Sequence, residues 1–125
     1  MEDKISLSAL GHTWILDLDG TIVKHNGYKT DNRDSLLDGA KEFMESIPEK
    51  DMVIFLTSRK LEFKEITENF LKSNGVRYDH IIYGVPYGER ILVNDDKPSG
   101  LKMAMAVCLQ RDAGIRLKIV EDENK

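Results

Sequence analysis

The sequence predicts an α/β fold in which a mostly parallel central sheet lies between two layers of helices. Short apolar runs alternate along the chain with amphipathic stretches of helical period, which is the pattern of parallel strands joined by helices. One run, residues 52–56, is apolar throughout, as expected for a strand buried on both faces. The length of 125 residues is typical of one domain, so we expect residues 1–125 to form a single domain.

The first half of the chain predicts a strand, a loop and a helix. Residues 12–16 form a short apolar run with Trp and Ile, which favours a strand. Residues 22–34 are rich in turn formers and indicate an exposed loop or small hairpin, with a tight turn at Asn26-Gly27. From 34 to 47 apolar residues recur every three or four positions, which indicates a helix that Pro48 ends. Residues 1–10 are mixed in character and predict no definite element.

The second half continues the alternation of strands and helices. The expected elements are a strand at 52–56, an amphipathic helix at 61–73 closed by Asn74-Gly75, short strands at 80–83 and 90–93, a helix at 101–111 after Pro98, and an edge strand at 117–120.

Composition excludes several classes of protein. With 18 Lys and Arg against 22 Asp and Glu, the net charge of −4 argues against a general nucleic-acid binder, although an anionic substrate is still compatible with a local cationic cleft. No targeting segment and no apolar run of membrane-spanning length is present, so we expect a cytoplasmic protein without membrane contact. Cys108 is the single cysteine, and its apolar surroundings predict a buried structural thiol.

Two acids follow the first strand and are the strongest functional signal. Asp17 and Asp19 stand two residues apart, so they point to the same side of a strand and favour a cation between them, such as Mg²⁺. Gly20 permits a sharp turn, and Thr21 adds a hydroxyl. A simple turn would also contain these residues. A calcium loop of the EF-hand type is excluded, because its fifth and twelfth positions would be Thr21 and Tyr28.

Two other predicted strands also end in polar residues. Thr57-Ser58-Arg59 follows the strand at 52–56, and Asn94-Asp95-Asp96-Lys97 follows the strand at 90–93. Ligands of open parallel sheets bind at the carboxyl ends of the strands. The sequence therefore predicts that acids, hydroxyls and cations meet at one edge of the sheet.

Together these segments resemble the haloacid dehalogenase superfamily, most of whose members are Mg²⁺-dependent phosphohydrolases with a Rossmann-like fold. The resemblance covers residues 12 to 112: residues 17–21 match the first motif, Thr57 the second, and Asp95-Asp96 the paired acids of the fourth. It implies a phosphomonoesterase in which Asp17 is the nucleophile that forms an aspartyl-phosphate, and Asp19 is the general acid and base. The chemistry agrees, because a carboxylate can attack phosphorus once charge repulsion is offset, and a second carboxyl can transfer the proton.

The resemblance also implies the ligands of the phosphoryl group and of the metal. Thr57, together with backbone N–H groups of the turn after Asp17, would donate to phosphoryl oxygens. The expected substrate-binding residues are Leu18, Gly20, Thr21, Ser58 and Arg59. Mg²⁺ would be bound by Asp17, by the carbonyl of Asp19 and by Asp95, with Asp96 as a further ligand or an orienting acid.

The third motif departs from the family pattern, because no lysine stands between Tyr78 and Asn94. Lys97 is the favoured substitute for the missing cation, and Arg90 and Arg59 are the other candidates. The gaps between motifs hold no cap domain, so the chain resembles a capless member. Specificity would then come from residues 22–34, from residues 83–89, or from a neighbouring subunit of a homo-oligomer.

Two other functions compete with the phosphatase. A signalling receiver also carries a phosphorylated Asp, but its acid pair and phosphorylated Asp stand in another order, so it is an alternative without steady turnover. A dehalogenase of the same superfamily is disfavoured by Asp19, because halide displacement needs neither a metal nor a second acid at that position. Capless relatives act on bulky or exposed phosphates, and the resemblance favours a phosphorylated sugar or related intermediate of surface-polysaccharide synthesis.

Overall fold

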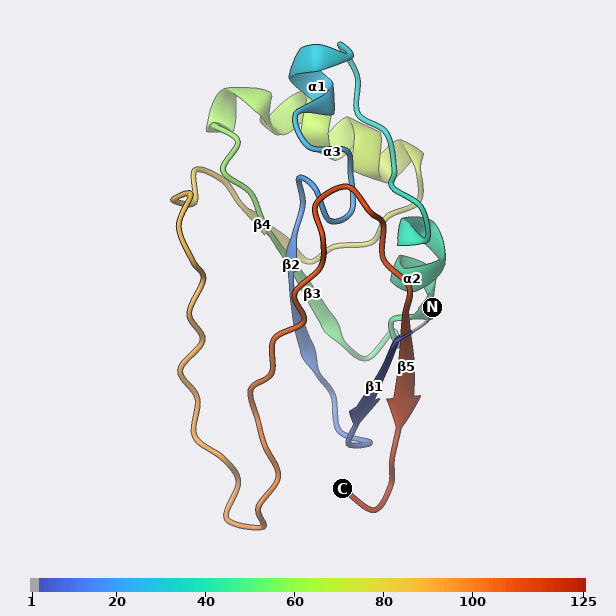
Figure 1. Cartoon of the computed structure of the whole chain (residues 1–125), viewed down its shortest axis with the longest axis vertical. Coiled ribbons are helices and arrows are strands. Elements are labelled where there is room, and N and C mark those ends of the chain that lie inside the picture. The colour runs from blue at the N-terminus through green and yellow to red at the C-terminus, as the bar shows by residue number, and fades with distance from the viewer. Residues whose placement is uncertain (1–2) are drawn as a thin grey trace.

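The computed structural model describes residues 3–125. The elements are, in order, β1 (Asp3–Leu7), β2 (Thr13–Asp17), α1 (Gly27–Thr30), α2 (Ala40–Ser46), β3 (Met52–Leu56), the 3₁₀ turn η1 (Leu61–Phe63), α3 (Lys64–Ser73), β4 (His80–Ile82) and β5 (Leu117–Glu121) (Figure 1). No helix in this described part of the chain has the length and apolar character that crossing a membrane requires.

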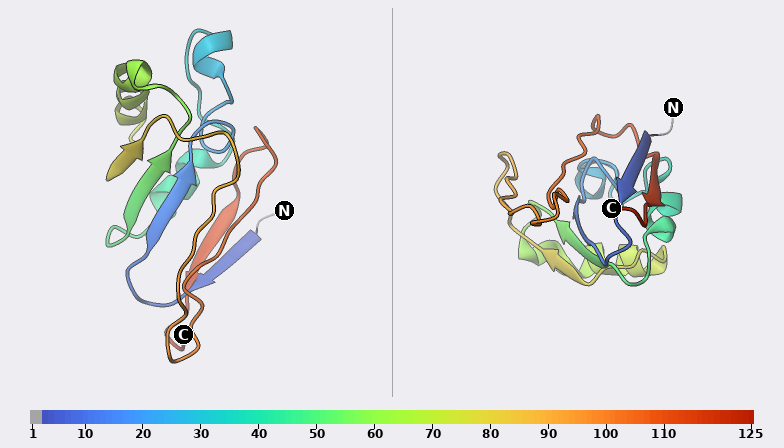
Figure 2. Two further views of the ribbon diagram at one scale, coloured as in Figure 1. Left: turned by 90° about the vertical axis from the view of Figure 1, so that its left-hand side faces the viewer. Right: turned by 90° about the horizontal axis from the view of Figure 1, so that it is seen from below.

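All strand pairs are parallel, which confirms the predicted Rossmann-like α/β fold. β2, β3 and β4 form one sheet with β3 in the middle, and β1 pairs with β5 in a second sheet (Figure 2). The prediction of one central sheet is therefore wrong in that the strands divide into two sheets. α2 connects them, because it contacts β5 while its Phe43 packs edge-on against Trp14 of β2, with ring centroids 5.7 Å apart.

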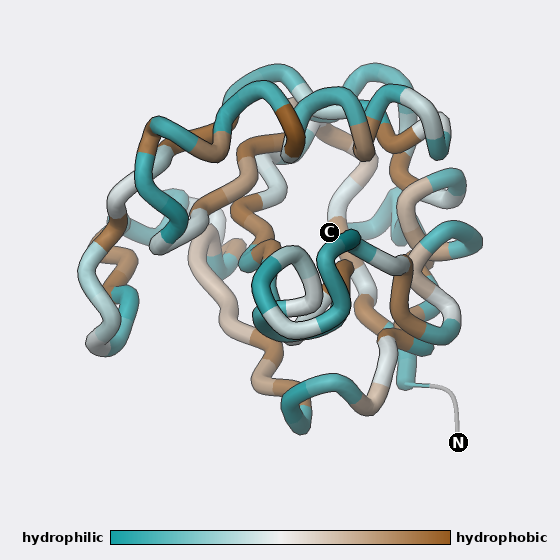
Figure 3. Tube along the Cα trace, turned by 90° about the horizontal axis from the view of Figure 1, so that it is seen from above, coloured by the Kyte–Doolittle hydropathy of each residue, from teal (hydrophilic) through white to brown (hydrophobic). Residues whose placement is uncertain are grey.

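The core lies on one side of the three-stranded sheet. Trp14 and Leu16 of β2 and Val53 and Phe55 of β3 are buried, whereas Ile15 between the first two is 48% exposed. The apolar strand at 52–56 was expected to be buried on both faces, but its Met52 is exposed. The strands are thus more open than predicted, and Figure 3 shows hydrophilic residues along much of the outer loops.

A buried polar cluster fixes the start of β2 beside the start of β3. The Asp51 side chain is fully buried and accepts hydrogen bonds from His12 N at 3.0 Å, His12 Nδ1 at 2.8 Å and Trp14 Nε1 at 2.9 Å. Burial by itself would raise the pKa of Asp51, but the hydrogen bonds from Trp14 and His12 outweigh burial and hold that pKa below its ordinary value.

Several predicted elements have different bounds in the structure. The helix expected at 34–47 is confirmed only for Ala40–Ser46. Gly39 has a φ of 78°, which is outside the α-helical range, so the helix cannot include Gly39 or begin before it. The helix at 61–73 begins with the 3₁₀ turn η1, and the strand at 80–83 ends at Ile82. The edge strand at 117–120 is confirmed as β5, and its partner β1 comes from residues for which the sequence predicted no element.

The segment between β4 and β5 contradicts three predictions. Within the described residues, neither the strand expected at 90–93 nor the helix expected at 101–111 forms. Residues 83–116, between β4 and β5, instead form an extended segment without helix or strand (Figure 1). Ile91 is 85% and Val93 is 88% exposed, and Cys108 is exposed rather than buried. A short amphipathic helix is marginal unless its apolar face packs on another element. The extended segment has no such surface in this structure, which is why its helical pattern does not produce a helix.

Candidate active site

The site is built where β2 and β3 end side by side. Asp17 pairs in register with Leu56, so the chain leaves both strands at the same level. Beyond β2 the chain turns at Gly20, whose φ of 89° favours glycine and whose N–H donates to the carbonyl of Val23 at 2.7 Å. A Cβ at Gly20 would also lie 3.1 Å from Cγ of Arg111. Asp17, at the end of β2, and Asp19, just before this turn, both line one cavity.

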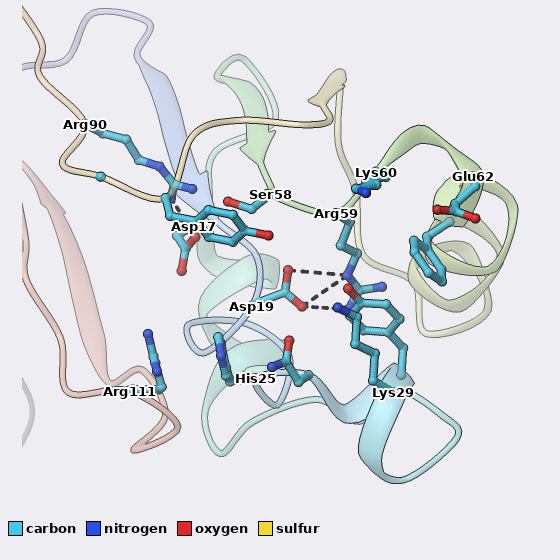
Figure 4. A pocket seen from close by; sticks show the side chains of 15 residues that line it. Asp17, Asp19, His25, Lys29, Ser58, Arg59, Lys60, Glu62, Arg90 and Arg111 are labelled. Atoms are coloured by element: carbon cyan, nitrogen blue, oxygen red, sulfur yellow. Dashed lines mark hydrogen bonds and ion pairs between the residues drawn. The ribbon is translucent and has the colours of Figure 1, made fainter.

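The cavity has a volume of about 450 Å³ and brings together segments from four parts of the chain (Figure 4). Its walls come from the end of β2, from the loop 22–34, from the residues that follow β3, and from the extended segment between β4 and β5. The lining residues are Asp17, Asp19, His25, Asn26, Tyr28, Lys29, Ser58, Arg59, Lys60, Glu62, Phe63, Tyr87, Gly88, Arg90 and Arg111.

Both oxygens of Asp17 accept hydrogen bonds. Thr21 Oγ1 donates to Oδ2 at 2.9 Å, and Arg90 Nη1 donates to Oδ1 at 2.6 Å. The side chains of Asp17 and Arg90 are 37% and 34% exposed, so this ion pair lies at the mouth of the cavity. Asp17 is therefore a solvent-accessible carboxylate with a cation beside it.

Asp19 lies deeper and has different partners. Thr57 Oγ1 donates to its Oδ2 at 2.9 Å, and Arg59 donates to its Oδ1 from Nη2 at 2.8 Å and from Nε at 3.1 Å (Figure 4). Thr57 is 1% exposed and is not among the residues that line the cavity. In this structure its hydroxyl thus donates to Asp19 rather than toward the space where a phosphoryl group would bind.

Arg59 is a buried cation between two acids. Besides Asp19 it donates to Asp34 Oδ1 at 2.6 Å and to Asp34 Oδ2 at 3.0 Å. Burial alone would lower the pKa of the Arg59 guanidinium, but the hydrogen bonds and charges of Asp34 and Asp19 raise that pKa above its ordinary value. Arg59 is therefore permanently charged.

Some of the predicted site residues come together and others do not. Asp17, Asp19, Ser58 and Arg59 line the cavity. Gly20 and Thr21 form the turn next to the cavity. The Leu18 side chain is buried at 1% exposure, so Leu18 contributes only backbone groups to this turn. The remaining predicted residues lie on the extended segment, are exposed and do not line the cavity: Asp95, Asp96 and Lys97. Asp96 instead pairs with Lys102 at 2.7 Å.

This arrangement does not fit the metal site that the resemblance implies. Within residues 3–125 no three His, Cys, Asp or Glu side chains are grouped so that they could hold a metal ion. Asp17 and Asp19 converge, but an arginine is paired with each of them, and Asp95 is not beside them. Each carboxylate of the pair is thus neutralised by an arginine and not arranged around a cation.

Sequence reasoning missed much of the cationic lining of the cavity. His25 and Lys29 lie in the loop 22–34, which was predicted to contribute to specificity, but nothing in the sequence singled out either residue. Lys60 directly follows Thr57-Ser58-Arg59. The sequence predicts a helix for residues 101–111, so nothing in it indicates that Arg111 lies over Gly20.

Comparisons with known proteins support the fold. No family model matches this chain, and no curated protein matches it. A chain in the solved "Structure of Pnkp1/Rnl/Hen1 complex" is similar, with a TM-score of 0.51 and 27% sequence identity. The match covers 66% of this chain and 31% of that chain, so the present chain corresponds to about a third of its length. This similarity is compatible with the resemblance found in the sequence, but assigns no substrate or mechanism.

Proposed function

We propose that the protein is a phosphomonoester hydrolase of the haloacid dehalogenase type that acts through an aspartyl-phosphate on Asp17. The observation that carries the proposal is the pair of carboxylates in one cavity with unequal surroundings. Asp17 is accessible at the mouth, whereas Asp19 is 15% exposed and held by Thr57 and Arg59. Two acids in different environments can take different roles in one reaction.

The accessible acid is suited to nucleophilic attack. An oxygen of Asp17 would form a bond to phosphorus while the bond between phosphorus and the leaving oxygen breaks. Arg90, which now donates to Asp17 at 2.6 Å, can donate to a phosphoryl oxygen from the same position and offset the negative charge. Arg90 therefore replaces Lys97 as our candidate for the missing third-motif cation, because Lys97 does not line the cavity.

The deeper acid is suited to proton transfer. Asp19, after taking up a proton, would give it to the leaving oxygen, and would then accept a proton from the water that attacks the phosphorus of the intermediate. That attack breaks the bond from Asp17 to phosphorus and releases inorganic phosphate. The resemblance assigns Thr57 a contact with the phosphoryl group. For that contact its hydroxyl would have to turn away from Asp19.

A magnesium requirement is part of the proposal and rests on the sequence motifs. Asp95 would have to approach Asp17 to complete such a site, and none of the steps above depends on it. For the substrate we propose a phosphorylated sugar or a related, bulkier phosphate of surface-polysaccharide synthesis. The support for a large substrate is the open cavity, whose lining includes the exposed Lys29 and Lys60.

The test is steady release of inorganic phosphate by the purified protein from a panel of phosphorylated metabolites, with Mg²⁺ present. Many phosphates released per protein molecule support the proposal, provided that Asp17→Asn abolishes release. Labelling that stops at one phosphate per protein would contradict it and would favour the receiver-like phosphoacceptor. Acid quenching of Asp19→Asn should trap the phosphorylated protein, because breakdown of the intermediate needs the base.

A further inference from the structure

The guanidinium of Arg59 has no hydrogen-bond donor left for a substrate. An arginine side chain carries five N–H groups. Nε donates to Asp19, Nη1 donates to Asp34 at 3.0 Å and to Thr67 Oγ1 at 2.8 Å, and Nη2 donates to Asp19 at 2.8 Å and to Asp34 at 2.6 Å. Each N–H group therefore already has an acceptor within the protein.

One face of the guanidinium is also covered by an aromatic ring. The carbon Cζ of Arg59 lies 3.9 Å from the centre of the Tyr28 ring, and this ring packs edge-on against Phe63 at 5.0 Å. The Arg59 side chain is 1% exposed, although it forms part of the cavity wall (Figure 4). A phosphoryl group could reach this cation only by displacing a carboxylate or the ring.

The charges explain why such displacement is unfavourable. The Asp34 side chain is 4% exposed, and Arg59 is the cation paired with it. Taking the guanidinium away would leave a buried carboxylate without a partner, which is strongly destabilising. An anionic substrate would thus compete with two carboxylates that are already in place.

We propose that Arg59 is a positioning residue, not a ligand of the phosphoryl group. It holds Asp19 just beyond the end of β2, and it ties the loop 22–34, through Tyr28 and Asp34, to Thr67 of α3. The inference deepens the proposed function, since it rests on Asp19 as the acid and base. It follows that the loop 22–34 is a fixed wall of the site, and that Arg90 is the cation available to the phosphate.

The first test separates positioning from phosphate binding by kinetics. Arg59→Lys keeps the charge but loses the paired hydrogen bonds, and Asp34→Asn removes the far anchor without touching Asp19. Both variants should lower kcat at least tenfold, with inhibition by inorganic phosphate changed less than twofold. Asp31→Asn is the matched control in the same loop, because Asp31 is exposed and pairs with Lys24 instead. A tenfold weaker phosphate inhibition in Arg59→Lys would overturn the proposal.

The second test needs no turnover, so it stays valid if the proposed activity fails. The N–H signal at Nε of Arg59 is assigned by NMR through its loss in Arg59→Lys. We expect slow hydrogen exchange at this proton, faster exchange in Asp34→Asn, and no shift when inorganic phosphate is added. Fast exchange in the unmodified protein, or a shift on adding phosphate that saturates, would overturn the positioning role.

Discussion

Replacing Arg90 by Met tests whether this arginine supplies the cation that the third motif lacks. The substitution keeps the length of the side chain and removes its charge and its hydrogen bond to Oδ1 of Asp17. Lys97→Ala is the matched variant, because Lys97 is the candidate from the sequence but is exposed and outside the cavity.

The structure predicts a large effect on rate and a small effect on stability. Because both side chains of the Arg90 and Asp17 pair are about one-third exposed, at 34% and 37%, the pair contributes at most about 1 kcal/mol to folding. Loss of one electrostatic donor in an active site costs about 100- to 1,000-fold in kcat, or about 3–4 kcal/mol. The effect on catalysis should therefore exceed the effect on folding severalfold in free energy.

The assay is phosphate release at saturating substrate, with urea unfolding of the same preparations as a measure of stability. Arg90→Met should lose about 100-fold or more in kcat, and Lys97→Ala should stay within about threefold of the unmodified protein. Arg90 is not the third-motif cation if Lys97→Ala loses the activity and Arg90→Met keeps it. Equal losses in rate and in folding free energy for Arg90→Met would also exclude a specific catalytic role for Arg90.

Four further predictions concern the site and the core. Asp17→Asn should reduce turnover by several orders of magnitude without changing the urea midpoint, and residual activity above about 1% would exclude covalent catalysis by Asp17. Activity should require Mg²⁺ and be inhibited by Ca²⁺, and full activity in excess chelator would contradict the metal proposal. Asp51→Ala should cost about 3–5 kcal/mol of folding free energy, because it leaves buried donors of Trp14 and His12 without an acceptor. Unfolding followed by Trp14 fluorescence measures this cost, and a loss below about 1 kcal/mol would contradict the prediction. Since the folded pKa of Asp51 lies below its ordinary value of 3.8, its contribution should be complete above about pH 4 and decline as the pH falls through the folded pKa.

The part of the site that could be predicted from sequence is the part set by strand geometry. Asp17 ends β2, Asp19 follows two residues later, and Thr57 follows β3 at the same level, so an alternation of strands and polar residues suffices to place them together. Arg59 was also expected at this edge. Its partners Asp34 and Thr67 were not, because they depend on where the loop 22–34 folds back and on how α3 is turned.

The extended segment shows the limit of pattern reasoning. Residues 101–111 have helical periodicity, but periodicity only says which side chains would share a face, not that a surface is present to bury that face. Residues 90–93 likewise form no strand in the described part of the chain. Asp95, Asp96 and Lys97 lie outside the cavity, whereas Arg111 lines it. The pairing of β1 with β5 was equally hidden, since the two strands come from opposite ends of the chain.

The pairing of the two terminal strands has a consequence for cutting the chain. A protease that cleaves after the exposed Lys102 would separate residues 1–102 from residues 103–125. The second piece would still pair through β5 with β1, while the backbone N–H of Asp112 donates to Gly20 at 2.9 Å and Ile115 remains in the core. We therefore expect the two pieces to associate when mixed as separate polypeptides, with β5 and the turn at Asp112 supplied in trans to the cavity.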